Sequence, residues 1–215
     1  MLLFCFNISP CAARDVDPIV EGIRARYGHL DGIAVKYTRE VITRTMSMLG
    51  EQARGDLATG TIFLKPPYFL KLEQHKPRKE TIFTDGDTLW WYIPSEKIAY
   101  RYPVEEFGKE LRLLSSIFTG LSDNRADFKI ELLEQSKQDE DIIRLVPDPP
   151  WQEIDHIRIT VGHCFDIRQV KIYNSLGGIT HFQLGGVEEK KALDPGFFRF
   201  VAPPGVDLRQ EGGSN

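Results

Sequence analysis

The sequence predicts a mainly β (α+β) fold, in which consecutive antiparallel strands form a barrel or a strongly bent sheet. Apolar and polar residues alternate over most of the stretch from residue 33 to residue 201, and turn sequences such as Asp85-Gly86 separate the alternating runs. Helical periodicity is confined to residues 16–28 and 104–121. A chain of 215 residues is long enough to bury a sizeable core as one domain.

The first expected element is a short amphipathic helix over residues 16–28. Its apolar residues Ile19, Ile23 and Tyr27 recur at every fourth position, which places them on one face. The period then changes to two, and this change predicts one long strand with a single apolar face over residues 33–41.

Further strands are expected on both sides of the second helical segment. Asp85-Gly86 and residues 174–178 have the composition of hairpin turns, whereas Pro66-Pro67 lacks the backbone N–H groups of a central strand and marks a strand end. The expected strands cover residues 57–65, 68–76, 79–84, 88–93 and 96–102 before that segment, and 126–135, 142–147, 154–162, 167–174, 178–185 and 197–201 after it.

Residues 104–121 interrupt the strands with a second amphipathic helix. Glu105-Glu106 in its first turn complements the positive end of the helix dipole. A curved sheet needs apolar material inside it, and its own side chains, this helix or a ligand can fill that space. The apolar stripe of the helix consists of Phe107, Leu111, Leu114, Ile117, Phe118 and Leu121.

The N-terminus has features of an export signal. Residues 2–8 are mostly apolar and Cys11-Ala12-Ala13 offers small residues to a signal peptidase, so residues 1–13 are expected to be the remnant of a signal peptide whose start lies upstream. Lipidation of Cys11 and an ordinary terminus are the alternatives. Cleavage leaves Cys164 without a disulfide partner, in a single domain over residues 14–209 followed by a disordered polar tail over residues 210–215.

The charge and the reactive residues disfavour several classes of function. A net charge of −4 differs from the concentrated basic face of nucleic-acid-binding proteins, and no apolar run is long enough to span a membrane as a helix. His163, Cys164 and His181 match no zinc spacing, and Ser115-Ser116 lacks the strand–turn–helix context of a nucleophile. We therefore expect no catalytic residue, metal or cofactor.

Large apolar side chains are concentrated between residues 60 and 92. Phe69-Leu70 and residues 89–93 are apolar on both strand faces, as occurs when one face packs against a core and the other packs against a helix or lines a cavity. From these residues alone, a β core and a ligand cavity are both open.

Three motifs, in this order and spacing, resemble the outer-membrane lipoprotein carrier family of LolA-like proteins, over about residues 15–209. They are Gly60-x-x-x-x-Lys65-x-Pro67, then Phe83-x-Asp85-Gly86-x-x-Leu89-Trp90-x-Tyr92, and finally Phe198-x-Phe200-x-x-Pro203-x-Gly205-Val206. The resemblance implies a half-open antiparallel β-barrel with helices forming a lid over an apolar cavity. The helices over residues 16–28 and 104–121 are the expected lid.

The resemblance also implies a function. Such a protein is a periplasmic chaperone, expected to be a monomer, that takes acylated lipoproteins from an inner-membrane ABC-type releasing complex. It delivers them to an outer-membrane acceptor lipoprotein or to the outer membrane directly, without a cofactor or nucleic acid. The residues expected to contact acyl chains are Phe63, Leu70, Leu72, Phe83, Trp90 and Tyr92 on the strands, and Leu114, Ile117 and Phe118 on the helix.

The sequence departs from the family pattern at the lid. Pro66 stands where well-known carriers have an arginine that helps to latch the lid, and Lys65 or Lys71 is the nearest cation. Leu72 replaces a common tryptophan. Two other functions fit the same cavity: carriage of another lipid, such as a glycolipid or polyisoprenoid, and lipid or lipoprotein sensing in an envelope stress pathway.

Overall fold

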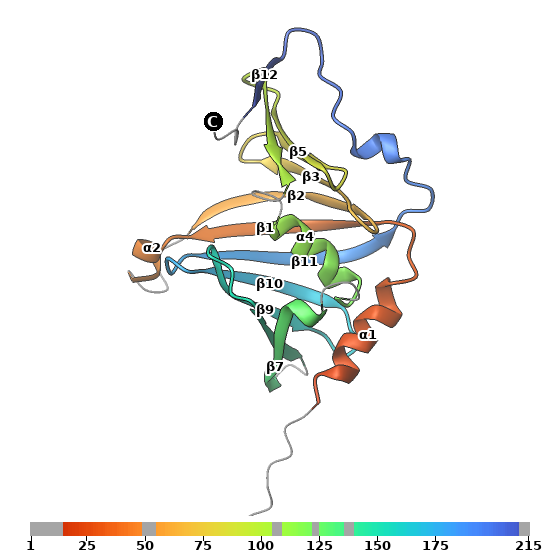
Figure 1. Ribbon diagram of the computed structural model, residues 1–215, viewed down its shortest axis with the longest axis vertical. Helices are drawn as coiled ribbons and strands as arrows, with labels where there is room; N and C mark the ends of the chain where they lie inside the picture. Colours follow the sequence, from red (N-terminus) through yellow and green to blue (C-terminus); the bar gives the residue numbers. More distant parts are fainter. Residues whose placement is uncertain (1–14, 49–54, 105–108, 122–124, 136–139, 211–215) are drawn as a thin grey trace, which may run out of the picture.

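The computed structural model describes residues 15–48, 55–104, 109–121, 125–135 and 140–210, which form a curved 12-stranded sheet with its two longer helices on the concave side (Figure 1). Within these residues the two edge strands of the sheet are not paired with each other, so the barrel remains half open. The prediction of a mainly β fold with an unclosed barrel is therefore confirmed.

The bounds of the elements follow the chain. The helices are α1 (Asp17–Tyr27), α2 (Arg44–Met48) and α4 (Lys109–Phe118), with short 3₁₀ turns η1 (Arg125–Asp127) and η2 (Pro195–Phe198). The strands are β1 (Ile33–Ile42), β2 (Asp56–Lys65), β3 (Phe69–Lys76), β4 (Glu80–Thr84), β5 (Thr88–Ile93), β6 (Ile98–Pro103), β7 (Phe128–Gln135), β8 (Asp141–Pro147), β9 (Ile154–Val161), β10 (Ile167–Asn174), β11 (Ile179–Glu189) and β12 (Asp207–Gln210).

Strand β1 lies in the middle of the sheet and joins its two halves. It pairs antiparallel with β2 on one side and with β11 on the other. The complete order is β12-β6-β5-β4-β3-β2-β1-β11-β10-β9-β8-β7. Strands β2 to β6 form one meander and β7 to β11 another, because consecutive strands in each run pair with one another, and β12 is added at the β6 edge.

The strand register divides the side chains of the sheet into two faces. Ile62, Leu72, Ile82 and Trp91 lie side by side across β2 to β5 on the concave face, which the helices cover. The next row along the strands, which runs from Phe63 to Trp90, therefore lies on the opposite, outer face.

Helix α1 packs its apolar stripe onto the concave face. Its buried residues include Ile19, Ile23 and Tyr27, as the four-residue period predicted. The Tyr27 hydroxyl accepts a hydrogen bond from the Ile167 backbone N–H at 3.3 Å, which ties the helix to β10. The Tyr27 ring also meets the Phe118 ring edge to face at 5.5 Å between centroids, and this contact joins α1 to α4.

Helix α4 lies across the concave side, between the two halves of the sheet (Figure 1). Leu113, Leu114, Ile117 and Phe118 are buried against the sheet, whereas Arg112 is exposed. This is the amphipathic helix that the sequence predicted over residues 104–121, of which residues 105–108 lie outside the described part of the chain.

The predicted strand over residues 197–201 is wrong. Residues 195–198 form the turn η2, whose backbone begins with a hydrogen bond from the Gly196 N–H to the Asp194 carboxylate at 2.6 Å. The last strand is β12, which pairs parallel with β6 at the edge of the sheet. The alternation in Phe198-x-Phe200 arises because this segment crosses the outer face of the sheet rather than joining it.

Two further differences concern the ends of the domain and one short helix. The signal-peptide remnant expected over residues 1–13 and residues 211–215 of the expected tail lie outside the described residues, whereas Gln210 belongs to β12. Helix α2 was not predicted, because its sequence Arg-Thr-Met-Ser-Met has no apolar periodicity.

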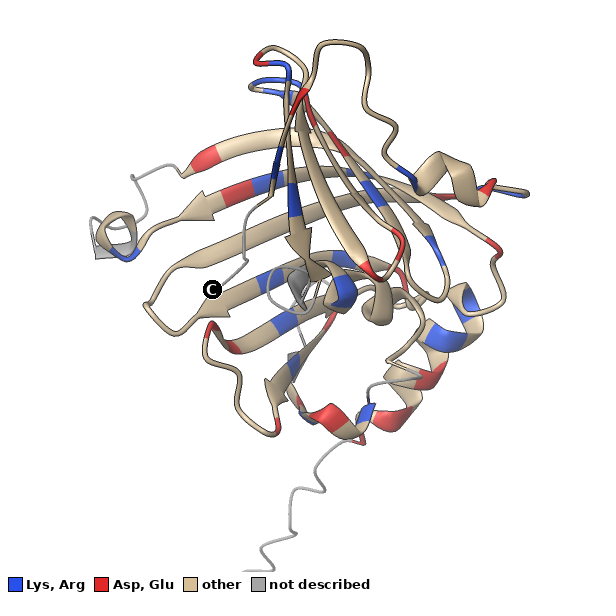
Figure 2. Ribbon diagram, turned by 45° about the horizontal axis from the view of Figure 1, so that its top comes forward, with Lys and Arg blue, Asp and Glu red and all other residues tan. Residues whose placement is uncertain are grey.

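Charged residues of both signs are distributed along the strands and over helix α1 (Figure 2). None of the helices in the described part of the chain combines the length and the hydrophobicity needed to cross a bilayer.

Candidate functional site

An apolar cavity of about 350 Å³ lies between helix α4 and the concave face. Leu72 of β3, Ile82 of β4 and Leu89 and Trp91 of β5 form part of its wall, and the register places Leu72, Ile82 and Trp91 next to one another on one face. Arg39 is the charged residue among the described residues that line it. The full lining is Arg39, Val41, Leu72, Ile82, Leu89, Trp91, Tyr102, Leu111, Leu114, Thr180 and Phe182.

A second cavity of about 430 Å³, here called the mouth cavity, lies between α4 and the turns at the ends of β2 and β4. Leu111 of α4 lines both cavities, so the two adjoin at this residue. The mouth cavity has more polar neighbours, including Ser115, Ser116 and Thr119 on α4. Tyr68 at its rim is 63% exposed, so this cavity opens to solvent.

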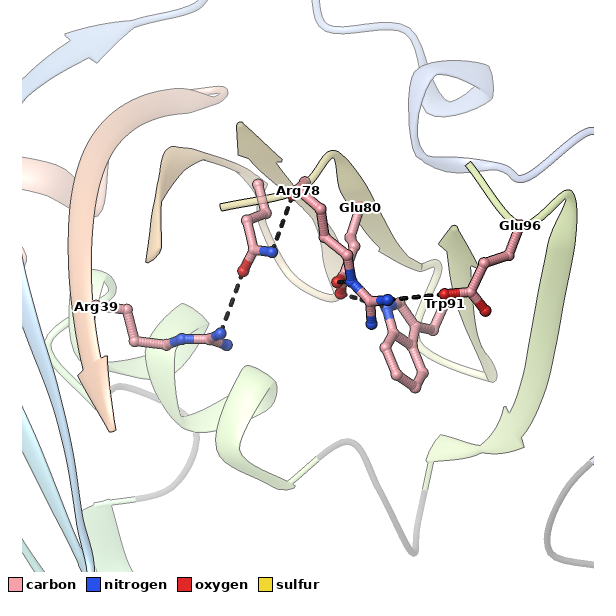
Figure 3. Close-up of polar contacts among 6 residues, drawn as sticks. Arg39, Arg78, Glu80, Trp91 and Glu96 are labelled. Atoms are coloured by element: carbon pink, nitrogen blue, oxygen red, sulfur yellow. Dashed lines mark hydrogen bonds and ion pairs between the residues drawn. The ribbon is translucent and has the colours of Figure 1, made fainter. Parts of the chain in front are cut away.

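Trp91 is held in the wall of the apolar cavity by a hydrogen bond from its indole Nε1 to Glu80 Oε2 at 2.8 Å (Figure 3). The same carboxylate forms an ion pair with the Arg78 guanidinium, which also donates to Glu96 Oε1 at 2.7 Å. The Glu80 carboxylate therefore has two partners, the Trp91 indole and the Arg78 guanidinium. The indole ring is fixed while its apolar surface remains available to the cavity.

Arg39 places a positive charge in the wall of the apolar cavity. Its Nη2 donates to Gln74 Oε1 at 3.2 Å, and Gln74 Nε2 in turn donates to the Arg78 backbone carbonyl at 3.1 Å (Figure 3). The Arg39 Nε is buried without a hydrogen-bond partner among the described residues. No ion pair between described residues includes Arg39.

Tyr37, two residues before Arg39 on the same face, is also buried, and its hydroxyl has no hydrogen-bond partner among the described residues. Burial raises the pKa of Tyr37 to about 12; the positive charge of Arg39 acts in the opposite direction, and Glu80 adds to the increase. The phenol therefore stays neutral at physiological pH. Its ring packs edge to face against Phe182, a residue of the cavity wall, at 5.8 Å.

The outer face carries a separate aromatic cluster, formed by Phe63, Phe83, Trp90 and Tyr92. The segment after η2 covers it, since the Phe200 ring lies 5.1 Å from Trp90, 5.3 Å from Tyr92 and 5.7 Å from Phe83. Phe197 meets Phe63 at 5.1 Å.

Lys71 completes the outer aromatic cluster. Its ammonium lies 4.0 Å from the centre of the Phe197 ring and 5.2 Å from that of Phe83, as in cation–π contacts. Lys65 pairs with Phe69 on the same outer face. Neither lysine therefore points toward α4, where a lid latch would act.

Pro66, at the position of the family arginine, lies beside α4 without forming a polar latch. It lines a small gap together with Ser115, Phe118 and Thr119 of the helix. The proline ring has no hydrogen-bonding group, so Pro66 cannot replace the polar latch of the family arginine. In the described residues, α4 is held by its buried apolar stripe and by its contact with α1.

The residues predicted to contact acyl chains form two groups. Leu72 and Leu114 line the apolar cavity, Leu70 lines the mouth cavity, and Ile117 and Phe118 are buried on the side of α4 that packs against the sheet. The other four residues form the outer aromatic cluster and line neither cavity: Phe63, Phe83, Trp90 and Tyr92.

Sequence reasoning missed several residues of the cavity wall, chiefly Ile82, Trp91, Arg39 and Phe182. The pairing of Leu72 with Ile82, and of Ile82 with Trp91, shows that they share one face. If the register had been known, counting every second residue from Leu72 through the Asp85-Gly86 turn would have identified Ile82 and Trp91.

The histidines and the cysteine considered above lie apart from the cavity. His163 and Cys164 are exposed at the turn between β9 and β10, and His181 contacts Gln169 at 3.0 Å. Within the described ranges, no group of three or more His, Cys, Asp or Glu side chains is placed to hold a metal ion.

Comparison with known proteins gives consistent matches. A family model described as "Outer membrane lipoprotein carrier protein LolA" matches residues 47–201. A protein named outer-membrane lipoprotein carrier protein from Nitrosospira multiformis is 26% identical over 157 residues, which cover 72% of this chain and 73% of the relative. One of the same name from Hahella chejuensis is 24% identical over 211 residues and 98% of each chain.

A solved structure supports the fold alone. An uncharacterised conserved protein from Thermus thermophilus superposes with a TM-score of 0.55 at 7% sequence identity, over 91% of this chain and 99% of that protein.

Proposed function

Since the chain belongs to the LolA family of outer membrane lipoprotein carrier proteins, we propose that it binds the acyl chains of lipoproteins on its concave face and carries them through the periplasm. The observation that supports this proposal best is the apolar cavity of about 350 Å³ between α4 and the strand wall. Large pockets lined mainly by apolar side chains are the usual form of sites for apolar ligands.

The proposal agrees with the energetics of moving a lipid through water. Each CH₂ group that leaves water contributes about 0.8 kcal/mol, so an acylated protein does not leave a membrane at a useful rate unless its chains are covered. Leu72, Ile82 and Leu114 supply apolar cover without directional bonds. Such a surface adapts to chains of different lengths and releases them to an acceptor.

The size of the cavity requires movement of α4 during loading. A volume of about 350 Å³ is at the small end of the range of about 300–1,000 Å³ that ligand pockets occupy. A lipoprotein with several long chains needs more space. Because the apolar cavity and the mouth cavity adjoin at Leu111 of α4, displacement of this helix is expected to join the two.

The family match also supports the partners and the route. We place the protein between an inner-membrane ABC-type complex that releases lipoproteins and an acceptor lipoprotein in the outer membrane, or the outer membrane itself. The protein is a carrier in this scheme and performs no catalytic step. Carriage of another lipid, such as a glycolipid or polyisoprenoid, is the competing function.

The test is native mass spectrometry of the protein purified from the envelope of its own host cells. Copurification of triacylated lipoproteins, released when the complex is denatured, is the expected result. A glycolipid or polyisoprenoid alone would favour the competing function. A protein free of lipid, including after incubation with a purified triacylated lipoprotein in mild detergent, would contradict both.

A further inference from the structure

Arg39 is an unusual residue to find in the wall of an apolar cavity. An arginine side chain carries five N–H donors and a permanent charge, and burial without compensation is costly for both. Gln74 accepts one hydrogen bond from Nη2, at 3.2 Å, whereas Nε has no acceptor among the described residues. Arg39 as a whole is half-buried, so its buried Nε is the part of the guanidinium that contacts among the described residues leave unsatisfied.

The neighbouring groups do not supply the missing negative charge. Glu80 forms an ion pair with Arg78 and accepts the indole hydrogen bond of Trp91. Tyr37 is neutral, because burial holds its pKa at about 12. Its hydroxyl also lacks a partner within the described residues, so the region around Arg39 has hydrogen-bond donors that need acceptors.

The surroundings of Arg39 are apolar and suited to a hydrocarbon chain. Leu72, Ile82 and Trp91 of β3 to β5 and Leu114 of α4 line the same cavity as Arg39. A ligand that satisfies both parts of the site has a single hydrocarbon chain and an acidic group at its end. Carboxylate and phosphate oxygens match the planar fork of a guanidinium through two parallel hydrogen bonds.

From this arrangement we propose that the apolar cavity binds single acyl chains that end in an anionic oxygen group, with Arg39 as the residue that recognises the anion. The proposal rests on the proposed function, since it uses the same acyl-binding cavity. It adds a class of ligand, the fatty acid carboxylate or the lipid phosphate, to the acyl chains of lipoproteins.

The experiment compares ligands that share one chain and differ in the head group. Binding of dodecanoate and dodecyl phosphate below their micellar concentrations, and of 1-dodecanol below its solubility limit, is measured by isothermal titration calorimetry at neutral pH. Dodecanoate, dodecyl phosphate or both are expected to bind about tenfold or more tightly than the alcohol, because hydrogen bonds between ions in an apolar site are strong. The tighter of the two acids identifies the carboxylate or the phosphate as the preferred source of the anion.

Two variants assign the preference to Arg39. In Arg39→Met, the acids and the alcohol are expected to bind with similar affinity, and binding of the alcohol is retained because the apolar wall is intact. Lys36→Met is the matched control, since Lys36 is exposed on the outer face of the same strand. It is expected to keep the full preference for the acids. Circular dichroism establishes that both variants are folded.

Several outcomes would overturn the inference. Equal affinity of the wild-type protein for the acids and the alcohol would do so without any variant, and so would a preference that persists in Arg39→Met. Loading with a purified triacylated lipoprotein is measured in parallel. If the lipoprotein binds while the acids show no preference, this inference alone fails; if neither the lipoprotein nor dodecanol binds, the proposed function fails.

Discussion

At the residue scale, the composition of the cavity wall depends on which of two neighbouring residues in a strand points toward the concave face. The segment Leu89–Ile93 is apolar throughout, so it contains no polar residue that distinguishes its two faces. Sequence reasoning could therefore predict a wall in this region but not its phase, and it selected Trp90 and Tyr92 where the structure places Trp91 in the cavity. Only the register with β4, through the pair Ile82 and Trp91, resolves the phase.

The neutral, buried Tyr37 leads to a prediction about stability at high pH. Its folded-state pKa of about 12 lies above the value of about 10 for an exposed tyrosine, so the unfolded chain loses this proton first as the pH rises. The free energy of unfolding is expected to fall between pH 10 and pH 12 by about 1.4 kcal/mol per pH unit because of this group. Below pH 10 the group has no effect on the pH dependence.

Urea unfolding at pH 8, 10 and 11.5 tests this dependence, with Tyr37→Phe as the comparison. The variant lacks the titrating group, so its stability is expected to fall less steeply over the alkaline range. Parallel slopes for the two proteins would show that Tyr37 titrates normally.

The close packing around Gly60 leads to a second prediction about stability. A methyl group there would collide with the backbone carbonyl oxygen of Glu73 and lie 2.8 Å from the Tyr37 ring. Gly60→Ala is therefore expected to destabilise the protein by about 1–3 kcal/mol, as overpacking does. Gly186→Ala is the matched control, because nothing lies within 4 Å of the added carbon in β11. Equal thermal stability of the two variants would contradict the close approach at Gly60.

Ile82 offers a direct test of the cavity wall. Ile82→Glu places a carboxylate among apolar side chains, where acyl chains would have to displace its water, so lipoprotein loading is expected to fall to about a tenth or less. Leu72 is a poorer choice, because it is only 4% exposed and a charge there would also destabilise the fold.

Thr81→Glu is the control for this substitution, since Thr81 is the preceding residue and pairs with Tyr92 on the outer face. It is expected to load normally. A gel-filtration assay that follows transfer of labelled lipoprotein to each variant measures the effect, and normal loading of Ile82→Glu would remove this wall from the site.

At the scale of elements, the C-terminal segment shows where pattern reasoning succeeds and fails. The alternation Phe198-x-Phe200 predicted a strand, and the alternation is real, but its apolar side chains pack onto the sheet from outside. Strand β12 has no apolar alternation because all its residues are exposed at the edge of the sheet. An alternation of apolar residues indicates which side chains are buried, but it does not indicate whether the backbone pairs with a strand of the sheet.

The role of this segment leads to a prediction that separates it from the cavity. Phe200 contacts three aromatic rings of the outer cluster, so Phe200→Ala is expected to lower the free energy of unfolding by about 2–4 kcal/mol. Val201→Ala is the matched control, because Val201 is 82% exposed, and a change within about 0.5 kcal/mol is expected.

Lipoprotein loading of Phe200→Ala, at a temperature where it remains folded, is expected to be normal. Loss of loading in the folded variant would instead connect the outer aromatic cluster to the bound lipid.

At the scale of the whole molecule, the sequence predicted the two meanders and the helix between them, because each of these features is local. It did not predict that β1 lies between β2 and β11, since no pattern in either strand identifies a partner so distant in the chain. The cavity depends on this pairing. Arg39 and Val41 from β1, and Thr180 and Phe182 from β11, form its wall together.

The position of α4 across both halves predicts a change on loading. If acyl chains displace the helix, the backbone amides of α4 should exchange hydrogen faster in the loaded protein, while those of β10, which is paired on both sides, should be unchanged. Hydrogen exchange followed by mass spectrometry, with empty and loaded protein in the same buffer, measures this difference. Equal or stronger protection of α4 in the loaded protein would show that the helix does not move aside.

The pairing of β1 with β11 also has a consequence for the time course of folding. Ile33 at the start of β1 pairs with Glu189 at the end of β11, so this ladder closes a very long loop and must overcome its closure entropy. The hairpins on either side involve neighbouring strands and form more readily. We therefore expect a refolding chain to contain two separate half-sheets at first, and to gain a lipid-binding surface only in the slow final step that unites them.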